Sequence, residues 1–271
     1  MDIEREIKNY KDQFRDKIVF CNCDDPKESN FVKYFSNNFE HLGLKKLIAT
    51  HYKEANLFTQ EAPYKLEYSG DKNGNHKPDL DEFTTKMIGT GDFRSKECIE
   101  LLKEADIVVT NPPFSLFREY IEQLTEYDKK FLIIGNTNAL TYKEIFKLIK
   151  NNKLRTGYTN FNLGMFFIVP DNWEQFHHIN EDGKKIARVS TSCWFTNLEV
   201  EKHKEEIVLY KKYSSEEYPK YDNYDAIEVS KVSDIPLDYS GAMGVPVTFI
   251  DKYNPEQFEI IDAIGRYSML T

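Results

Sequence analysis

The stretch Asp106-Ile107-Val108-Val109-Thr110-Asn111-Pro112-Pro113-Phe114 decides how this chain folds. Its β-branched apolar run predicts a buried strand, which the two prolines end because neither can donate to a sheet ladder. A residue that precedes proline is kept extended, so the turn is rigid. Residues 116–124 then predict a helix. The stretch therefore places an amide, two proline carbonyls and an aromatic ring at the carboxyl end of a strand, the edge where open α/β sheets bind ligands.

This cluster of groups suits the binding of a flat ring that carries an amine. The ring can stack on Phe114 while the amine donates hydrogen bonds to the Asn111 side chain and the Pro112 carbonyl. The alternative is a proline-rich turn between a strand and a helix, with Phe114 filling the hydrophobic core. Because the motif follows directly on a buried strand, the sequence favours the ligand-binding interpretation.

Asn111-Pro112-Pro113-Phe114 resembles the catalytic motif of S-adenosylmethionine-dependent amino-methyltransferases that act on adenine N6. The wider pattern is similar to the EcoRI-type adenine-specific DNA methyltransferase family over residues 16–262. Three further segments carry this similarity: Cys23-Asp24-Asp25-Pro26 with Ser29-Asn30-Phe31, Gly91-Asp92-Phe93, and Gly244-Val245-Pro246-Val247-Thr248-Phe249.

The resemblance implies a fold, a cofactor and a substrate. The fold is α/β, a Rossmann-like class I methyltransferase sheet that is mostly parallel with a terminal antiparallel hairpin, followed by a smaller C-terminal segment. The cofactor is S-adenosylmethionine, and the substrate is an adenine flipped out of double-stranded DNA. The expected catalytic residues are Asn111, Pro112, Pro113 and Phe114.

Length, composition and charge limit the possible classes of protein. The 271 residues can bury a large core, and 30% charged with 40% hydrophobic residues is ordinary for a globular protein. No apolar run reaches the length of a membrane span and no signal peptide is recognisable, so we expect a cytoplasmic protein. A net charge of −9 argues against a protein that coats nucleic acid, so contact with DNA must be local. The four cysteines lack zinc-site spacing, and we expect no metal.

Hydrophobic patterns and turn residues predict alternating strands and helices. The helices are expected at residues 2–16, 31–41, 96–103, 116–124 and 142–150, and the strands at 18–21, 46–52, 83–88, 107–109, 130–135, 164–170 and 188–199. This order is typical of a parallel sheet with right-handed crossovers. An antiparallel pair of the last two strands would form the terminal hairpin, and residues 205–210 are a candidate final strand. Residues 59–82 indicate an insertion or hairpin, with a candidate strand at 64–68, rather than a core element.

The loop after the first strand lacks the glycine-rich sequence that usually lets this cofactor approach the backbone. A carboxylate of Asp24 or Asp25 can pair with the cofactor's ammonium and sulfonium, and the N–H groups of the next helix can bind its carboxylate. The alternative is a cluster that only caps the helix, which Ser29 alone can do. The resemblance assigns Cys23, Asp24, Asp25, Ser29 and Asn30 to cofactor binding.

Two more loops bear on the cofactor. An acid at the end of the second strand normally holds its ribose, but this end reads Thr50-His51-Tyr52-Lys53-Glu54, where the acid comes late, so the ribose contact stays open. After the strand at 83–88, the resemblance implies that Asp92 accepts a hydrogen bond from the cofactor adenine and that Phe93 packs against its ring. The alternative for Asp92 is a carboxylate that stabilises a turn.

Four residues are candidates for contact with DNA. Lys143 and Lys147 belong to a basic stretch at 142–155, which either faces solvent or contacts phosphates beside the catalytic edge. Trp194 or Phe195 either helps to wall the target base or packs in the core. We expect a catalytic domain at residues 1–210 and a C-terminal segment at 211–271 that recognises the target or closes over the cofactor.

The predicted reaction is site-specific methylation of DNA adenine at N6, in a restriction-modification system or a mobile element. A cognate restriction endonuclease could act in the same system without forming a stable complex. Two alternatives are left open by the sequence. One is the same chemistry on RNA or on a protein glutamine, and the other is a nucleic-acid-binding protein that has kept the fold and lost catalysis.

Overall fold

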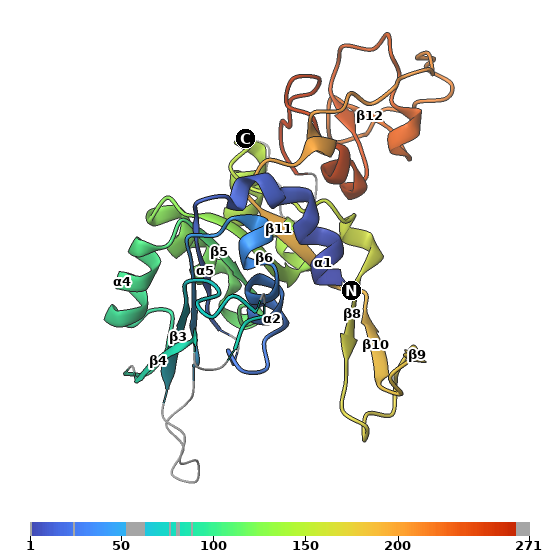
Figure 1. Ribbon diagram of the computed structural model, residues 1–271. Coiled ribbons are helices and arrows are strands. Elements are labelled where there is room, and N and C mark those ends of the chain that lie inside the picture. The colour runs from blue at the N-terminus through green and yellow to red at the C-terminus, as the bar shows by residue number, and fades with distance from the viewer. Residues whose placement is uncertain are drawn as a thin grey trace.

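One large sheet forms the centre of the protein (Figure 1). The computed structural model describes residues 2–23, 25–52, 63–75, 77–79, 82–87 and 89–263. The sheet has eight strands in the order β4-β3-β2-β1-β5-β6-β11-β7. Their bounds are β1 (Ile18–Cys21), β2 (Lys46–Thr50), β3 (Tyr64–Tyr68), β4 (Thr84–Met87), β5 (Ile107–Thr110), β6 (Lys130–Asn136), β7 (Arg155–Thr156) and β11 (Ser192–Thr196). The predicted α/β class is confirmed.

The four central strands are parallel, and strands of opposite direction flank them. β1 pairs with β2 and with β5, and β5 pairs with β6, all in parallel. Outside them, β3 is antiparallel to β2, and β11 is antiparallel to β6. Because β1, β2, β5 and β6 all end at the same side, the loops after them meet there, and we call this side the carboxyl edge. Ligands of such sheets bind at this edge.

Helices cover both faces of the sheet. Successive side chains of a strand point to opposite faces, so the buried residues of the strands form two separate cores. In β1, Val19 faces one core and Phe20 faces the other. The first face carries α1 (Asp2–Ile7), the 3-10 helix η1 (Lys8–Phe14), α2 (Asn30–Asn37) and α3 (Phe39–Leu42). The second face carries α4 (Lys96–Glu104), α5 (Phe117–Glu126) and α6 (Lys143–Lys150). The side chains of the central strands β1, β2, β5 and β6 are therefore almost all buried.

The antiparallel end of the sheet differs from the prediction. The segment expected as one strand at 188–199 is two strands, β10 (Lys185–Val189) and β11, and β8 (Met165–Ile168) pairs with β10 in a separate sheet with β9 (His178–Ile179). The antiparallel end of the main sheet is made instead by β11 and the short β7. Gly164 lies against the turn at 190–191, where an added Cβ would come within 2.8 Å of the Ser190 Cα. This close contact lies where β8 begins and β10 ends, and both of these strands belong to the separate sheet.

The segment at 64–68 is a strand of the main sheet, which corrects the prediction of an insertion outside the core. β3 pairs with β2, and its side chains Tyr64, Leu66 and Tyr68 are buried. Tyr68 packs edge-on against Phe39 of α3, with ring centroids 5.0 Å apart. β4, expected as a further parallel strand, is the outermost strand and is antiparallel to β3.

The C-terminal lobe, residues 207–260, has a small core of its own. Its elements are short: β12 (Ile227–Glu228), β13 (Met243–Gly244) and the 3-10 helices η7 (Val232–Asp234) and η8 (Val247–Lys252). The predicted strand at 205–210 is wrong, since these residues belong to no strand. The Gln257 side chain takes the place of a ladder partner, because it accepts from the Ile207 N–H at 2.7 Å and donates to the Ile207 carbonyl at 2.9 Å.

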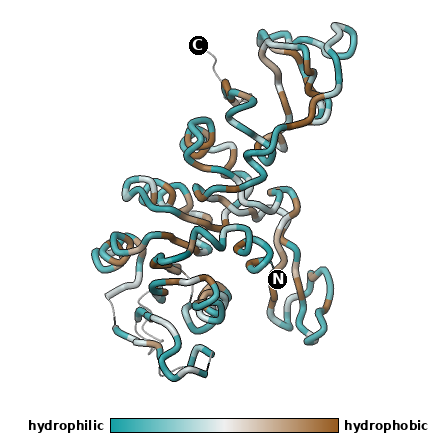
Figure 2. The backbone as a smooth tube through the Cα atoms, turned by 45° about the horizontal axis from the view of Figure 1, so that its top comes forward, coloured by the Kyte–Doolittle hydropathy of each residue, from teal (hydrophilic) through white to brown (hydrophobic). Residues whose placement is uncertain are grey.

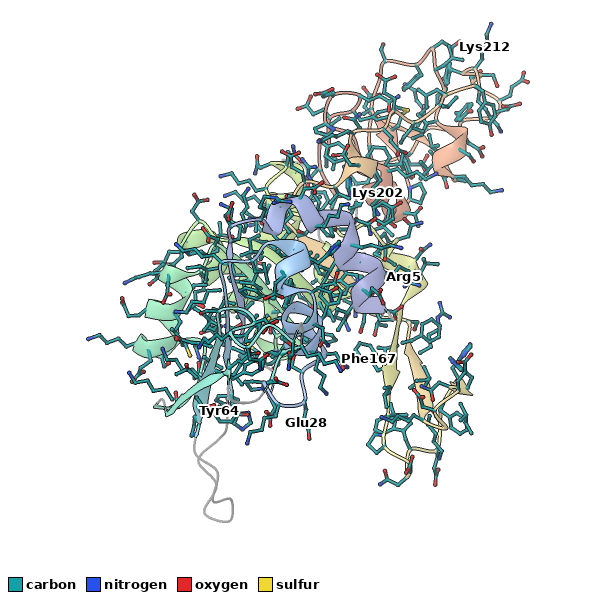
Figure 3. The ribbon with its side chains drawn as sticks, in the orientation of Figure 1. Arg5, Glu28, Tyr64, Phe167, Lys202 and Lys212 are labelled. Atoms are coloured by element: carbon teal, nitrogen blue, oxygen red, sulfur yellow. The ribbon has the colours of Figure 1, made fainter. Side chains whose placement is uncertain are left out.

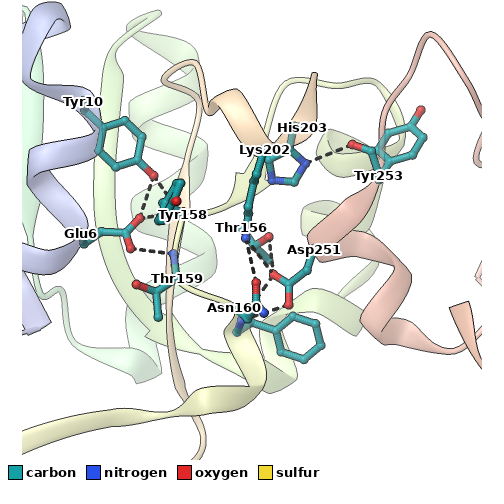
Figure 4. Close-up of polar contacts among 11 residues, drawn as sticks. Glu6, Tyr10, Thr156, Tyr158, Thr159, Asn160, Lys202, His203, Asp251 and Tyr253 are labelled. Atoms are coloured by element: carbon teal, nitrogen blue, oxygen red, sulfur yellow. Dashed lines mark hydrogen bonds and ion pairs between the residues drawn. The ribbon is translucent and has the colours of Figure 1, made fainter. Parts of the chain in front are cut away.

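A buried polar cluster attaches the lobe to the β7 side of the sheet (Figure 4). Asp251 of η8 accepts a hydrogen bond from the Thr156 hydroxyl at 2.9 Å, and the Lys202 ammonium lies 3.4 Å away. His203 of η6 (Glu201–His203) has its Nδ1 3.0 Å from the Tyr253 carbonyl oxygen. Burial lowers the pKa of His203 to about 4, so the ring is neutral at pH 7. The lobe is thus held by polar contacts that are largely shielded from water.

The carboxyl edge and most of the lobe lie at different ends of the molecule. Figure 3 shows Glu28 and Tyr64, which mark the carboxyl edge, far from Lys212 of the lobe. Figure 2 shows the lobe and the β8–β10–β9 sheet extending from the body in different directions. The lobe approaches the carboxyl side at a cavity of about 790 Å³, whose walls include Thr141 of η4 (Thr137–Thr141) and Tyr239.

Candidate active site

The Asn-Pro-Pro-Phe turn leaves β5 at the centre of the carboxyl edge. Asn111 is half-buried, and its Oδ1 is enclosed without a hydrogen-bond partner among the described residues. Pro112 is buried, and Pro113 is exposed. Leaving a buried acceptor unpaired costs about 1–3 kcal/mol, so the Asn111 amide is placed to accept a hydrogen bond from a ligand.

Phe114 does not fill the core, so that part of the alternative interpretation is wrong. It begins the 3-10 helix η3 (Phe114–Leu116) and is 39% exposed. The core position is taken by Phe117, which is buried and packs against Phe195 with ring centroids 5.0 Å apart. The Phe114 ring is therefore accessible for stacking, three residues after Asn111 in the same turn.

The loop after β1 is tied to the end of β5. The Thr110 hydroxyl donates to the Asn22 carbonyl, and the Tyr120 hydroxyl donates to the Asn22 Oδ1. The next residue, Cys23, has φ 72°, in the left-handed region that favours glycine. The loop thus has a backbone conformation typical of glycine, although the sequence has no glycine there.

Asp25 and His51 face each other between the ends of β1 and β2. Asp25 Oδ1 accepts hydrogen bonds from the Tyr64 hydroxyl at 2.9 Å and the Lys27 N–H at 3.0 Å, and its Oδ2 lies 3.7 Å from His51 Nδ1. Burial alone would raise the pKa of Asp25, but these hydrogen bonds and the nearby His51 and Lys27 hold it below its ordinary value. Asp25 is therefore an anion at the carboxyl edge. Its neighbour Asp24 lies outside the described residues.

The start of α2 accounts for two more of the predicted cofactor residues. The Ser29 hydroxyl accepts hydrogen bonds from the N–H groups of Phe31 and Val32, so it caps the helix as the alternative interpretation predicted. Asn30 is the exposed first residue of the helix. Both residues border the loop that carries Cys23 and Asp25.

The loop of residues 89–93 returns from β4 to the end of β2. Gly91 has φ 68°, and an added Cβ would lie 2.1 Å from the His51 carbonyl oxygen. Asp92 accepts hydrogen bonds from Arg94 Nε at 2.9 Å and Nη2 at 2.7 Å, which lowers the pKa of Asp92. Phe93 is buried and packs edge-on against Tyr120, so its ring belongs to the core beneath the loop rather than to an open surface.

Trp194 and Phe195 lie in the hydrophobic core, which corrects the prediction that they wall a base pocket. They are consecutive residues of β11 with exposures of 1% and 0%. The ring of Trp194 packs against Phe31, and that of Phe195 packs against Phe117. Neighbouring residues of a strand point to opposite faces, and helices cover both faces here, so neither ring reaches the carboxyl edge.

Three exposed cations lie on α5 and α6: Arg118 and Lys143 are near the starts of these helices, and Lys147 is in the last turn of α6. Lys143 and Lys147 are exposed on α6, as predicted for a basic face. Arg118, which the sequence analysis missed, is exposed on α5 one helical turn after Phe114, and its guanidinium lies 4.5 Å from the centre of the Tyr142 ring. Its spacing of four residues from Phe114 is the signal that could have identified it.

The described residues hold neither a cluster of metal ligands nor a membrane-spanning helix. No group of three or more His, Cys, Asp or Glu side chains in this part of the chain is placed to hold a metal ion. No helix within the same residues is long and apolar enough to cross a membrane.

A sheet with four parallel central strands, and with Asn-Pro-Pro-Phe presented at its carboxyl edge, defines the class of Rossmann-like amino-methyltransferases. Comparison with known proteins identifies the family. The chain belongs to the family described as adenine-specific methyltransferase EcoRI, which it matches over residues 1–270. This confirms the resemblance seen in the sequence motifs.

Three relatives show how far the similarity extends. The chain is 52% identical to the Type II methyltransferase M.EcoRI of Escherichia coli over 270 residues, 96% of this chain and 82% of that protein. It is 41% identical to the Type II methyltransferase M.MgeORF184P of Mycoplasma genitalium and 40% identical to M.MpnI of Mycoplasma pneumoniae. Both matches cover 97% of this chain, and they cover 81% and 80% of those proteins. No solved structure shows a significant match.

Proposed function

We propose that this protein transfers a methyl group from S-adenosylmethionine to N6 of an adenine at a specific site in double-stranded DNA. The observation that carries the proposal is the rigid turn that holds the unpaired Asn111 Oδ1 beside the exposed Phe114 ring. An amine on an aromatic base supplies the donor for Asn111, and the base itself supplies the stacking partner for Phe114. Membership of an adenine-specific family and the identity to M.EcoRI support adenine in DNA as the acceptor.

Asn111 and Pro112 activate the amine of the target adenine. This amine is a weak nucleophile, because its lone pair is delocalised into the ring. When the Asn111 Oδ1 and the Pro112 carbonyl accept its two hydrogens, the nitrogen becomes more tetrahedral and its lone pair is freed for attack. The same oxygens stabilise the positive charge that develops on nitrogen, until one proton leaves to solvent. The proline rings fix both acceptors in advance, so little reorganisation is needed.

Phe114 holds the base outside the DNA duplex. An adenine within the duplex cannot reach the turn, so the nucleotide must be flipped out. Stacking on an aromatic side chain contributes about 1–3 kcal/mol per base, which offsets part of the stacking lost from the duplex. Arg118 and Lys143 are exposed near the starts of α5 and α6 and supply cations for the phosphates of the opened strand, and Lys147 extends this basic surface along α6.

The residues at the ends of β1 and β4 fit the cofactor. S-adenosylmethionine supplies an electrophilic methyl group on a positively charged sulfonium. The ionised Asp25 would pair with positive charge on the cofactor, and the left-handed conformation of Cys23 gives the loop beside it the turn that a glycine usually makes. Asp92, on the loop that returns over β2, is the acceptor assigned to the cofactor adenine.

We assign target recognition to the C-terminal segment at 211–271. The cavity that the lobe shares with η4 supports this assignment, because η4 follows β6 directly at the carboxyl edge. The relatives are named Type II methyltransferases, which supports a modification enzyme of a restriction-modification system or a mobile element. Such an enzyme acts on DNA in the cytoplasm, and a cognate endonuclease would act without a stable complex.

Nucleoside analysis tests the proposal. The purified protein is incubated with labelled S-adenosylmethionine and, in parallel reactions, with DNA that lacks N6-methyladenine, with RNA of the same sequence, and with a protein substrate rich in glutamine. Labelled N6-methyldeoxyadenosine from the DNA reaction alone is the expected result. Transfer confined to RNA or to protein would assign the chemistry to another acceptor, and DNA binding without any transfer would contradict an enzymatic function.

A further inference from the structure

We propose that His51 binds the ribose of the cofactor, at the end of β2 where the sequence offers no early acid. The inference rests on the proposed function, because its ligand is the cofactor of that reaction. His51 directly follows the last residue of β2, Thr50. The acid that comes later in this segment, Glu54, lies outside the described residues.

The two ring nitrogens of His51 are placed for a ligand. Both are buried, and neither has a hydrogen-bond partner within the described part of the chain. The side chain as a whole is only 12% exposed, so bulk water does not satisfy them. Buried polar atoms are almost always paired, because an unpaired one destabilises the fold. The Asn111 Oδ1, assigned to the substrate amine, is in the same condition at the end of β5.

The neighbours of His51 determine which nitrogen faces the ligand. Asp25 Oδ2 lies 3.7 Å from Nδ1, and Asp25 is held in place by the Tyr64 hydroxyl, while the Tyr64 ring lies 5.3 Å from the His51 ring. A negative charge on the Nδ1 side favours the tautomer with its proton on Nδ1, which leaves Nε2 as an acceptor. A sugar hydroxyl can donate to this nitrogen, whereas a carboxylate cannot.

The position of His51 in the sheet also fits the ribose. β2 and β5 are the two neighbours of β1, so their ends lie roughly 10 Å apart. The cofactor methyl must meet the amine held by Asn111 at the end of β5, and the ribose links the sulfonium to the adenine. Asp25, which is proposed to pair with positive charge on the cofactor, lies 3.7 Å from His51, so a ribose next to that charge would be within reach of the His51 ring. Gly91 packs the loop of Asp92 directly against the His51 carbonyl, which puts the residue assigned to the cofactor adenine beside the one assigned to the ribose.

Calorimetry with ribose-modified ligands tests this inference without relying on activity. The probes are S-adenosylhomocysteine and its 2′-deoxy and 3′-deoxy analogues, titrated into the wild-type protein, His51→Ala and His51→Gln. His41→Ala is the matched control, because His41 is exposed on α3. Melting temperatures of all variants show whether each protein is folded.

The expected pattern is a loss of discrimination at one hydroxyl. The wild type and His41→Ala should bind at least one deoxy analogue roughly tenfold more weakly than S-adenosylhomocysteine, the equivalent of about 1.4 kcal/mol. His51→Ala should bind S-adenosylhomocysteine roughly tenfold more weakly than wild type and should no longer distinguish that analogue. His51→Gln, which keeps an acceptor, should regain part of the preference.

Two results would overturn the inference alone: a wild type that binds the ligand and both analogues equally, or a folded His51→Ala protein with the full wild-type affinity and preference for the ribose hydroxyls. If His51→Ala does not fold, a folded His51→Gln protein with no remaining preference for that hydroxyl would overturn the inference, because its amide keeps an acceptor. A wild type that binds none of the three ligands would overturn the proposed function together with the inference, so the two failures are distinguishable.

Discussion

Gly91→Ala tests how closely the loop of residues 89–93 lies against the end of β2. The new Cβ would lie 2.1 Å from the His51 carbonyl oxygen and 2.8 Å from its carbonyl carbon. Both are backbone atoms, so no side-chain rotation can relieve the overlap. Gly91 also has φ 68°, a conformation that alanine adopts only with strain. The substitution must therefore lift the loop, and Asp92 with it, away from β2.

The size of the effect follows from two contributions. A left-handed conformation costs a non-glycine residue about 1–2 kcal/mol, and overpacking adds about 1–3 kcal/mol. We expect Gly91→Ala to lower the free energy of unfolding by about 2–5 kcal/mol. Gly183→Ala is the matched control, because Gly183 has φ 77° and its Cβ would meet no described atom within 4 Å. Gly183→Ala should lose only the contribution of the left-handed conformation.

Urea unfolding of the two variants measures the difference, and calorimetry with S-adenosylhomocysteine measures the consequence for the site. Gly91→Ala should be less stable than Gly183→Ala by about 1–3 kcal/mol and should bind the ligand more weakly. Equal losses of stability with unchanged ligand affinity would show that the loop does not lie against His51, and the described path of residues 89–93 would be refuted.

Three further predictions concern stacking, backbone strain and pH. Phe114→Leu keeps an apolar side chain but loses the ring, so we expect the KM for DNA to rise by the equivalent of about 1–3 kcal/mol. Phe114→Tyr keeps the ring and should retain the wild-type KM. Equal KM values for the two variants would contradict base stacking. Cys23→Gly should keep or raise the free energy of unfolding measured in urea. Cys23→Val, whose side chain is β-branched, should lower this free energy by about 1–2 kcal/mol. The opposite order would contradict the left-handed conformation of Cys23. Burial lowers the pKa of His203 from 6.5 to about 4, so the folded protein keeps this ring neutral while the unfolded chain protonates it below pH 6.5. The free energy of unfolding is therefore highest above pH 6.5 and falls by about 3 kcal/mol as the pH drops toward 4. His203→Gln should lose correspondingly less stability over this range in urea unfolding at several pH values, and a profile parallel to wild type would disprove that role for His203.

The sequence predicted the elements that depend on local pattern. The β-branched run of β5, the prolines that end it and the Ser29 cap of α2 are all set by neighbouring residues, and the structure has them as expected. The exposure of Phe114 follows from the same local rules, because the two prolines prevent the strand from continuing and the helix core begins only at Phe117.

The errors concern contacts between distant segments. Trp194 and Phe195 are aromatic residues on a strand, and the strand pattern alone does not reveal that helices cover both of its faces. The pairing of β8 with β10 outside the main sheet depends on the close approach of Gly164 to Ser190, which no local pattern encodes.

Two features of the site were hidden for another reason. Cys23 takes the left-handed conformation without being a glycine, so the loop gave no glycine signal. The sequence also gives no sign of His51, because an acid is the usual residue at that position. The role proposed for it rests on ring nitrogens that only the fold shows to be buried without a partner among the described residues.

The central claim is that Asn111 activates the amine of adenine rather than binding the cofactor. The direct measurement is methyl transfer to unmethylated DNA, together with S-adenosylhomocysteine affinity, for Asn111→Ala and for the control Asn37→Ala on the exposed end of α2. We predict that Asn111→Ala transfers methyl groups roughly 100- to 1000-fold more slowly, the usual cost of removing one preorganised electrostatic partner, while both variants keep the wild-type affinity for the ligand. Transfer by Asn111→Ala at the wild-type rate would contradict the claim.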